Sequence, residues 1–202
     1  MKMTIADLVH QEMAKEEGAG VLLTNKSHKT QLYNFYENQA NWNGGGVPNF
    51  THPLKSVNVG AGVTTFISLP STFKGRVQRG AVQPATWVEF QLRAQNDNAA
   101  WGNISLEMGY DGAAMIRATD GSNSSNGFVQ DILKGAPAAA VVNNPQGQKV
   151  LDTTQGYWGG AGNKSASDYE FRVVGQKKAY ILGGTGTDMV RSKNQRLAID
   201  FY

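Results

Sequence analysis

The sequence predicts an all-β protein: an antiparallel β-sandwich with long loops rich in glycine and asparagine and one short N-terminal helix. Short runs from residue 20 onward alternate between apolar and polar side chains, which is the period of a half-buried strand. Turn-forming residues bound these runs, and 24 of the 202 residues are glycine. Only the N-terminus has helical spacing. Many short strands with turns between them are typical of sandwiches and barrels.

The N-terminal segment 1–17 is predicted to form an amphipathic helix. Thr4 and Asp7 have the spacing of a capping box. Apolar side chains follow at helical spacing, at Ile5, Leu8, Val9 and Met13. This stripe has no partner within its own segment, so residues 4–16 are expected to cover a sheet edge or to join copies of the chain in a homo-oligomer.

Residues 18–202 are predicted to form a single β-sandwich domain. The predicted strands are 21–24, 31–36, 55–59, 63–69, 75–79, 86–93, 102–110, 113–118, 128–133, 139–143, 149–153, 168–174, 179–182 and 196–202. Long loops are expected at 41–49, 119–127 and 155–163. Binding residues are often carried by such loops on a rigid sheet.

Composition excludes several classes of function. The chain has no cysteine, which excludes a disulfide scaffold, a thiolate zinc site and a cysteine nucleophile. The net charge of +3 is spread without basic runs, so no nucleic-acid partner is predicted. No signal peptide, membrane span, metal-ligand cluster or cofactor motif is found. The absence of cysteine permits a cytoplasmic location and does not exclude an extracellular one.

Five short motifs, in order, resemble those of thaumatin-like proteins. They are TNKS at 24–27, GAG at 60–62, GRVQR at 75–79, PATWVEF at 84–90 and NISLEMGYD at 103–111. The last two are similar to the family's PATLAEF and YDVSLVDGYN. The similarity extends over residues 20–118 and to the final strand, and it is that of a divergent, fungal-type, cysteine-free member. It implies a thaumatin-like sandwich, secretion and a cleft that faces a glucan.

The resemblance also implies which residues line that cleft. Arg79 and Glu89 fall on the positions of the family's arginine and glutamate, whereas Asn103 and Met108 stand where it has two aspartates. Asparagine does not ionise, and methionine does not transfer a proton. Half of the acidic set is therefore replaced, and the family's disulfides are absent. The resemblance thus implies the fold and a saccharide-facing cleft more strongly than hydrolysis.

Two predicted strands, 86–93 and 102–110, each have one apolar face and one polar face. In one hairpin register Glu89 lies opposite Glu107, which would place two carboxyl groups at about the separation of a retaining glycosidase. A slip of two residues would separate them and leave a solvated polar face. Aromatic side chains in polar loops, at Trp42, Trp101 and 157–158, either stack on sugar rings or fill gaps under their own loops.

The predicted function is non-catalytic binding of a polysaccharide such as a β-1,3-glucan. The predicted binding residues are Arg79, Trp87, Glu89, Asn103, Tyr110 and Asp111. The enzymatic alternative is a weak endo-β-1,3-glucanase that uses Glu89 with Glu107 or Asp111. A third interpretation is a self-associating storage, assembly or virulence-related protein with contacts through residues 4–16.

Overall fold

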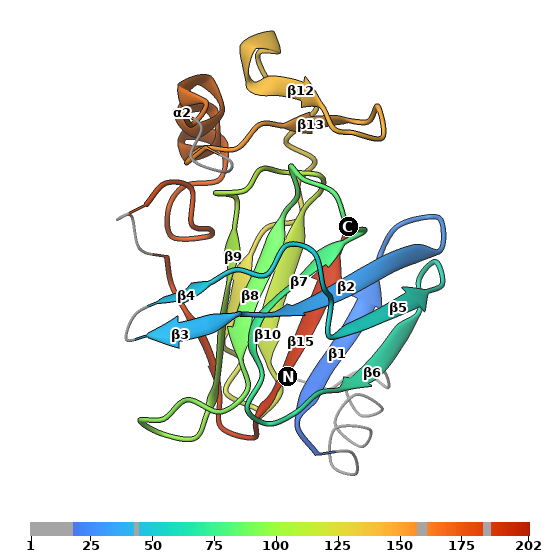
Figure 1. Cartoon of the computed structure of the whole chain (residues 1–202), viewed down its shortest axis with the longest axis vertical. Coiled ribbons are helices and arrows are strands. Elements are labelled where there is room, and N and C mark those ends of the chain that lie inside the picture. Colours follow the sequence, from blue (N-terminus) through green and yellow to red (C-terminus); the bar gives the residue numbers. More distant parts are fainter. Residues whose placement is uncertain (1–17, 43–44, 157–160, 184–186) are drawn as a thin grey trace.

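The computed structural model of the chain describes residues 18–42, 45–156, 161–183 and 187–202, so the helix predicted over 1–17 lies outside the described residues. The predicted β-sandwich is confirmed (Figure 1). One sheet has the strand order β11 (Ser125–Gly127), β10 (Ala114–Ala118), β15 (Arg196–Phe201), β1 (Gly20–Asn25) and β6 (Thr64–Ser68). The other has the order β14 (Val190–Ser192), β9 (Ala100–Ser105), β8 (Trp87–Gln91), β7 (Lys74–Arg79), β2 (Gln31–Glu37) and β5 (Lys55–Val59).

The core lies between the two sheets because each strand turns alternate side chains inward. In β2, Tyr33 and Phe35 are fully buried in this core, and in β8 Val88 and Phe90 join them. The ring of Phe90 stacks on Phe73 with centroids 4.8 Å apart. The same alternation turns Glu89 to the outer face of the six-stranded sheet.

Strand pairing is antiparallel except between β1 and β15, which run parallel with Gly20 opposite Arg196. The first and last described strands thus pair at the centre of one sheet, because β15 returns to lie between β1 and β10. This pairing closes the sandwich with contacts between the two ends of the sequence, as Figure 1 shows.

Helix α2 (Lys164–Val173) replaces the strand predicted over 168–174, and that prediction is wrong. Asn163 caps the helix, since its side chain accepts from the Ala166 N–H, and Gly175 follows it with a φ of +81°. The buried positions Ala166, Tyr169 and Glu170 recur at helical spacing. The apolar alternation at 169, 171 and 173 was misread as a strand, although both capping signals are in the sequence.

Small elements complete the chain. The β3 strand (Ala40–Trp42) pairs with β4 (Gly45–Val47), and β12 (Val141–Asn143) pairs with β13 (Lys149–Leu151) after the 3₁₀ turn η1 (Ala138–Ala140). Figure 1 places β12, β13 and α2 together at one end of the sandwich. Residues 128–133 and 179–182, predicted as strands, form none. Among the described residues, no helix is long and apolar enough to cross a membrane.

Candidate functional site

A row of polar side chains crosses the outer face of the six-stranded sheet on β8 and β9. Glu89 pairs with Asn103, and Gln91 pairs with Trp101 at the next outward position. The register with Glu107 opposite Glu89, one of the alternatives that the sequence left open, does not form. Strand β9 ends at Ser105, and the chain turns at residues 107–108. We call Gln91, Trp101, Glu89, Asn103 and Glu107 the polar strip.

Glu89 is the electrostatic centre of the polar strip. Its side chain is half-buried, and the pKa of Glu89 is raised to about 7. Loss of hydration is the largest cause of this rise and the negative charge of Glu107 adds to it, whereas the Asn103 amide and the Arg76 charge oppose it. Glu89 is therefore a carboxyl group that gains and loses its proton near neutral pH, in reach of solvent.

Glu107 lies beyond the end of β9 and is held by a residue distant in sequence. The Gln155 Nε2 group donates to Glu107 Oε1, which lowers the pKa of Glu107, while burial raises that pKa more strongly. The register separates Glu107 from Glu89 along the sheet, but its charge is still felt there. Two carboxyl groups with raised pKa values thus share this end of the outer face, a feature that is enriched at functional sites.

Arg76 lies beside Glu89 on the neighbouring strand β7 and is buried under rings. Its guanidinium carbon is 3.8 Å from the ring centroid of Trp87, 4.3 Å from that of Tyr36 and 5.2 Å from that of Phe50. It also donates to Gln78 Oε1 at 3.0 Å and, through Nη1, to the Asn49 carbonyl at 2.8 Å. Arg76 therefore fixes the segment after β4 over β7 and β8, where Figure 1 shows it crossing the sheet.

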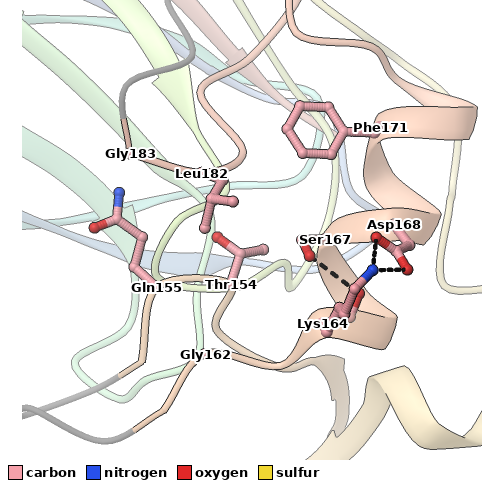
Figure 2. A pocket seen from close by; sticks show the side chains of 9 residues that line it. All are labelled: Thr154, Gln155, Gly162, Lys164, Ser167, Asp168, Phe171, Leu182 and Gly183. Carbon is pink, nitrogen blue, oxygen red and sulfur yellow. Dashed lines mark hydrogen bonds and ion pairs between the residues drawn. The ribbon is translucent and has the colours of Figure 1, made fainter.

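A hollow of about 570 Å³ lies beside Gln155 (Figure 2). Gln155 is also the residue that donates to Glu107 of the polar strip. We call the hollow beside Gln155 the α2 hollow. Its lining residues are Thr154, Gln155, Gly162, Lys164, Ser167, Asp168, Phe171, Leu182 and Gly183. In Figure 2, Gln155 stands on one side and Phe171 on the other, with Leu182 and Thr154 between them. The hollow offers one aromatic ring, amide and hydroxyl groups, and the Lys164–Asp168 ion pair at 2.7 Å.

The structure does not bring all predicted binding residues to the polar strip. Arg79 is on the core-facing side of β7, where Nη1 forms an ion pair with Asp111 at 3.0 Å. Tyr110 is fully buried, and its hydroxyl accepts from the Ile132 N–H at 3.2 Å. Strand alternation turns Arg79 away from the face that carries Glu89, and Asp111 is paired with Arg79 there. The Arg79–Asp111 ion pair is therefore not part of the polar strip.

Trp87 and Asn103 share the outer face with Glu89 but expose only 4% and 5% of their surface. The Trp87 ring packs against Phe50 at 5.5 Å, so the loop covers it. Trp101 is half-buried at the edge of the strip, with its Nε1 group donating to Asp97 at 3.2 Å. The Trp42 side chain and residues 157–158 lie outside what the structure describes.

Sequence reasoning missed Arg76 and Gln155 as functional neighbours. Arg76 was within the GRVQR motif, and its position opposite Glu89 follows only from the β7–β8 register. Gln155 meets Glu107 across 48 positions of sequence, and no local pattern signals that contact. Within the described ranges, no cluster of three His, Asp or Glu side chains is arranged to hold a metal ion.

No protein-family model matches the chain, and no curated protein matches its sequence. Similar solved structures include the protein elicitor MoHrip2 from Magnaporthe oryzae, with 9% identity, a TM-score of 0.43 and coverage of 91% of this chain and 98% of that one. The thaumatin-like xylanase inhibitor TLXI matches with 11% identity, a TM-score of 0.43 and coverage of 91% and 99%. A laminaripentaose-producing β-1,3-glucanase in complex with laminaritetraose matches with 20% identity, a TM-score of 0.42 and coverage of 66% and 52%. At these levels of similarity no function is assigned to this chain.

Proposed function

We propose that the polar strip binds a neutral polysaccharide of the β-1,3-glucan type without cleaving it, and that the saccharide continues into the α2 hollow. The supporting observation is Glu89, a half-buried carboxyl group that keeps solvent access between the amides of Gln91 and Asn103. Carboxylates and amides in this setting accept and donate to sugar hydroxyls. The glucan class comes from the resemblance of the sequence motifs to thaumatin-like proteins.

Two aromatic rings suit the apolar faces of sugar rings. Trp101 borders the strip beside Gln91, and Phe171 stands in the α2 hollow beyond Gln155. Rings of this kind stack on the C–H face of a pyranose, while neighbouring polar groups fix its hydroxyls. Gln155 connects the two places, since it lines the hollow and donates to Glu107.

Glycoside hydrolysis is the second candidate, because Glu89 has the raised pKa of a general acid. A retaining or inverting glycosidase needs a second carboxylate across the scissile bond. Asn103 occupies the position directly opposite Glu89, and an amide cannot serve as nucleophile or base in that role. Glu107 is the nearest described candidate for it and is held by Gln155. Binding is therefore the primary proposal.

Replacing Glu89 by glutamine tests the two functions together. A binder is expected to lose about 1–2 kcal/mol of affinity for soluble laminari-oligosaccharides, which is about a 5- to 30-fold rise in Kd, because the amide keeps the shape and loses the charge. Titration calorimetry measures the affinity, and a reducing-sugar assay measures cleavage. The matched control is Glu37→Gln on β2 of the same sheet, which is expected to bind like the wild type. Robust cleavage that Glu89→Gln abolishes would establish the glucanase instead, and no binding by the wild type rejects both.

Glucan affinity is also expected to depend on pH. Ionised Glu89 is the better acceptor for a hydroxyl, so the affinity of the wild type should fall as the pH drops through about 7. Glu89→Gln should remove this step, because glutamine does not titrate. Affinities measured from pH 5 to 8.5 would then meet at the acidic end and differ most at the basic end. A pH step of equal size in the variant contradicts the role of Glu89.

A further inference from the structure

A second hollow lies at one end of the sandwich, away from the polar strip. Its volume is about 290 Å³. It opens between the turn that joins β1 to β2, the end of β7, and the turn of residues 144–148 between β12 and β13. Figure 1 shows these segments near the end of β15. We call it the Arg79 hollow. Most of the residues that line it have polar side chains.

The floor of the Arg79 hollow is a rigid ion pair. Arg79 is 9% exposed, and its Nη2 group donates to the carbonyls of Ala113 and Tyr202 at 3.1 and 2.6 Å. Asp111 Oδ1 accepts from Arg79 Nη1 and from the Thr86 N–H, both at 3.0 Å. The other oxygen of Asp111 accepts no hydrogen bond from the described residues, and 17% of this side chain is exposed. Asp111 therefore presents a fixed acceptor at the bottom of the hollow.

A glycine makes room for this floor. A Cβ atom added at Gly112 would lie 2.5 Å from Arg79 Nη1 and 2.8 Å from its Cζ. At 2.5 Å one of the two groups must move, so the absence of a side chain at Gly112 lets the guanidinium lie flat beside Asp111. The floor is thus built into the backbone and not assembled from mobile surface groups.

The rim carries positive charge. Lys29, in the β1–β2 turn, and Lys149, at the start of β13, are both exposed and line the hollow. With Arg79 they give three basic side chains in the lining against one acidic side chain, Asp111, and Arg79 is paired with Asp111 and with the Tyr202 main-chain oxygen. A ligand in the hollow therefore meets an excess of positive charge at its outer end and one carboxylate acceptor at its inner end.

Side-chain amide groups line the Arg79 hollow between the Arg79–Asp111 pair and the two lysines. Asn144 holds the turn of residues 144–148, because its Oδ1 accepts from the N–H groups of Gln146 and Gln148 at 3.0 and 2.9 Å. Its Nδ2 group also donates to Gln148 Oε1 at 3.1 Å, which leaves the Gln148 amide nitrogen as a donor. Gln31 adds a further amide from β2. Fixed amides of this kind suit ring hydroxyls.

We infer that the Arg79 hollow binds an acidic sugar, a uronic acid residue of an oligosaccharide, with its carboxylate toward Lys29 and Lys149 and a hydroxyl donating to Asp111. A hydroxyl group satisfies the free Asp111 oxygen, and the lysines attract the sugar's carboxylate. A bare anion such as phosphate would be drawn to the lysines but would bring no sugar hydroxyl to Asp111. This site and its ligand are independent of the neutral glucan proposed for the polar strip.

Trigalacturonate is the probe, with its trimethyl ester as the neutral match that keeps the rings and all of the hydroxyls. Calorimetry and amide-resonance mapping at low salt should show the acid binding and shifting the resonances of residues 29, 111 and 144–149. The ester should bind at least tenfold more weakly. The double variant Lys29→Gln/Lys149→Gln should also weaken binding of the acid at least tenfold. Lys193→Gln, an exposed change in the β14–β15 turn at the other end of the sandwich, should leave it unchanged.

Each remaining outcome decides against the inference. Equal affinity for the acid and the ester would show that the hollow does not recognise the sugar's carboxylate. Full competition by inorganic phosphate at matched ionic strength would show that the lysines bind anions without recognising the sugar. No shift at residues 144–149 would place any binding elsewhere. Glu89→Gln serves as the second control: its affinity for trigalacturonate should equal that of the wild type even if its glucan binding is lost, so failure of one site is distinguished from failure of the other.

Discussion

Replacing Arg76 by methionine is expected to lower the free energy of unfolding by about 3 kcal/mol, the largest loss that a single change on the outer face should cause. Arg76 is 2% exposed, and its guanidinium lies among the rings of Tyr36, Phe50 and Trp87. Methionine fills much of its volume but leaves the Asn49 carbonyl and Gln78 Oε1 without these donors. Urea denaturation of the full chain measures the change.

The stabilising element in this prediction is the planar guanidinium and not the charge alone. Arg76→Lys keeps a positive charge but lacks the planar fork that lies against Trp87 and Tyr36 while it donates to Gln78 and Asn49, so it should recover less than half of the loss. Arg93→Met is the matched control, because Arg93 is exposed and, among the described residues, its side chain donates only to the exposed Asn98. Its effect should stay within about 0.5 kcal/mol. Full recovery by lysine would show that only the charge at position 76 matters.

Arg76→Met should also change the acidity of Glu89. The positive charge of Arg76 opposes the rise in the pKa of Glu89, so its removal should raise that pKa above about 7. A carbon-detected titration of the Glu89 side chain would show the midpoint move to higher pH. A midpoint that falls or stays constant contradicts the electrostatic coupling between β7 and β8.

The sandwich could be predicted because period-two alternation is a local property that tertiary contacts enforce. Val88 and Phe90 were assigned to the core and Glu89 to the outer face from the sequence alone, and the structure places them so. Helix α2 was missed for a related reason: Tyr169, Phe171 and Val173 alternate as in a strand, and the helix depends on the caps at Asn163 and Gly175.

The candidate site was predicted only in part because register is not local. Glu89 and Asn103 were placed on one polar face, but their direct pairing depends on where the 92–99 connection ends and β9 begins. Arg79 was grouped with Glu89 by resemblance, yet strand alternation within 75–79 turns it to the core side. The hydrogen bond from Gln155 to Glu107 joins segments that are far apart in the sequence, and no local pattern predicts it.

Glu170 is a fully buried carboxyl group on α2 for which no function is proposed. It lies on the buried face of α2 with 0% exposure, and neither carboxyl oxygen has a hydrogen-bond partner among the described residues. Burial raises the pKa of Glu170 well above its ordinary value, so the group stays protonated where other glutamates are charged. An unpartnered buried carboxyl destabilises the fold, and a well-packed apolar side chain of similar volume avoids that cost.

Glu170→Met is therefore expected to stabilise the protein by about 1–3 kcal/mol at pH 7. The unfolded chain releases the Glu170 proton at the ordinary glutamate pKa near 4.5, whereas the folded chain retains it to higher pH, so wild-type stability falls as the pH rises between these two values. The Met variant lacks this loss, and its advantage should grow by up to about 1.4 kcal/mol per pH unit above 4.5. Thermal and urea unfolding from pH 4 to 8 measure this difference in stability.

The control is Asp168→Asn, which replaces an exposed carboxylate on the same helix. It should change stability by less than about 0.5 kcal/mol. If the advantage of Glu170→Met is constant across this pH range, Glu170 ionises as readily in the folded chain as in the unfolded one. That result would contradict the raised pKa of Glu170.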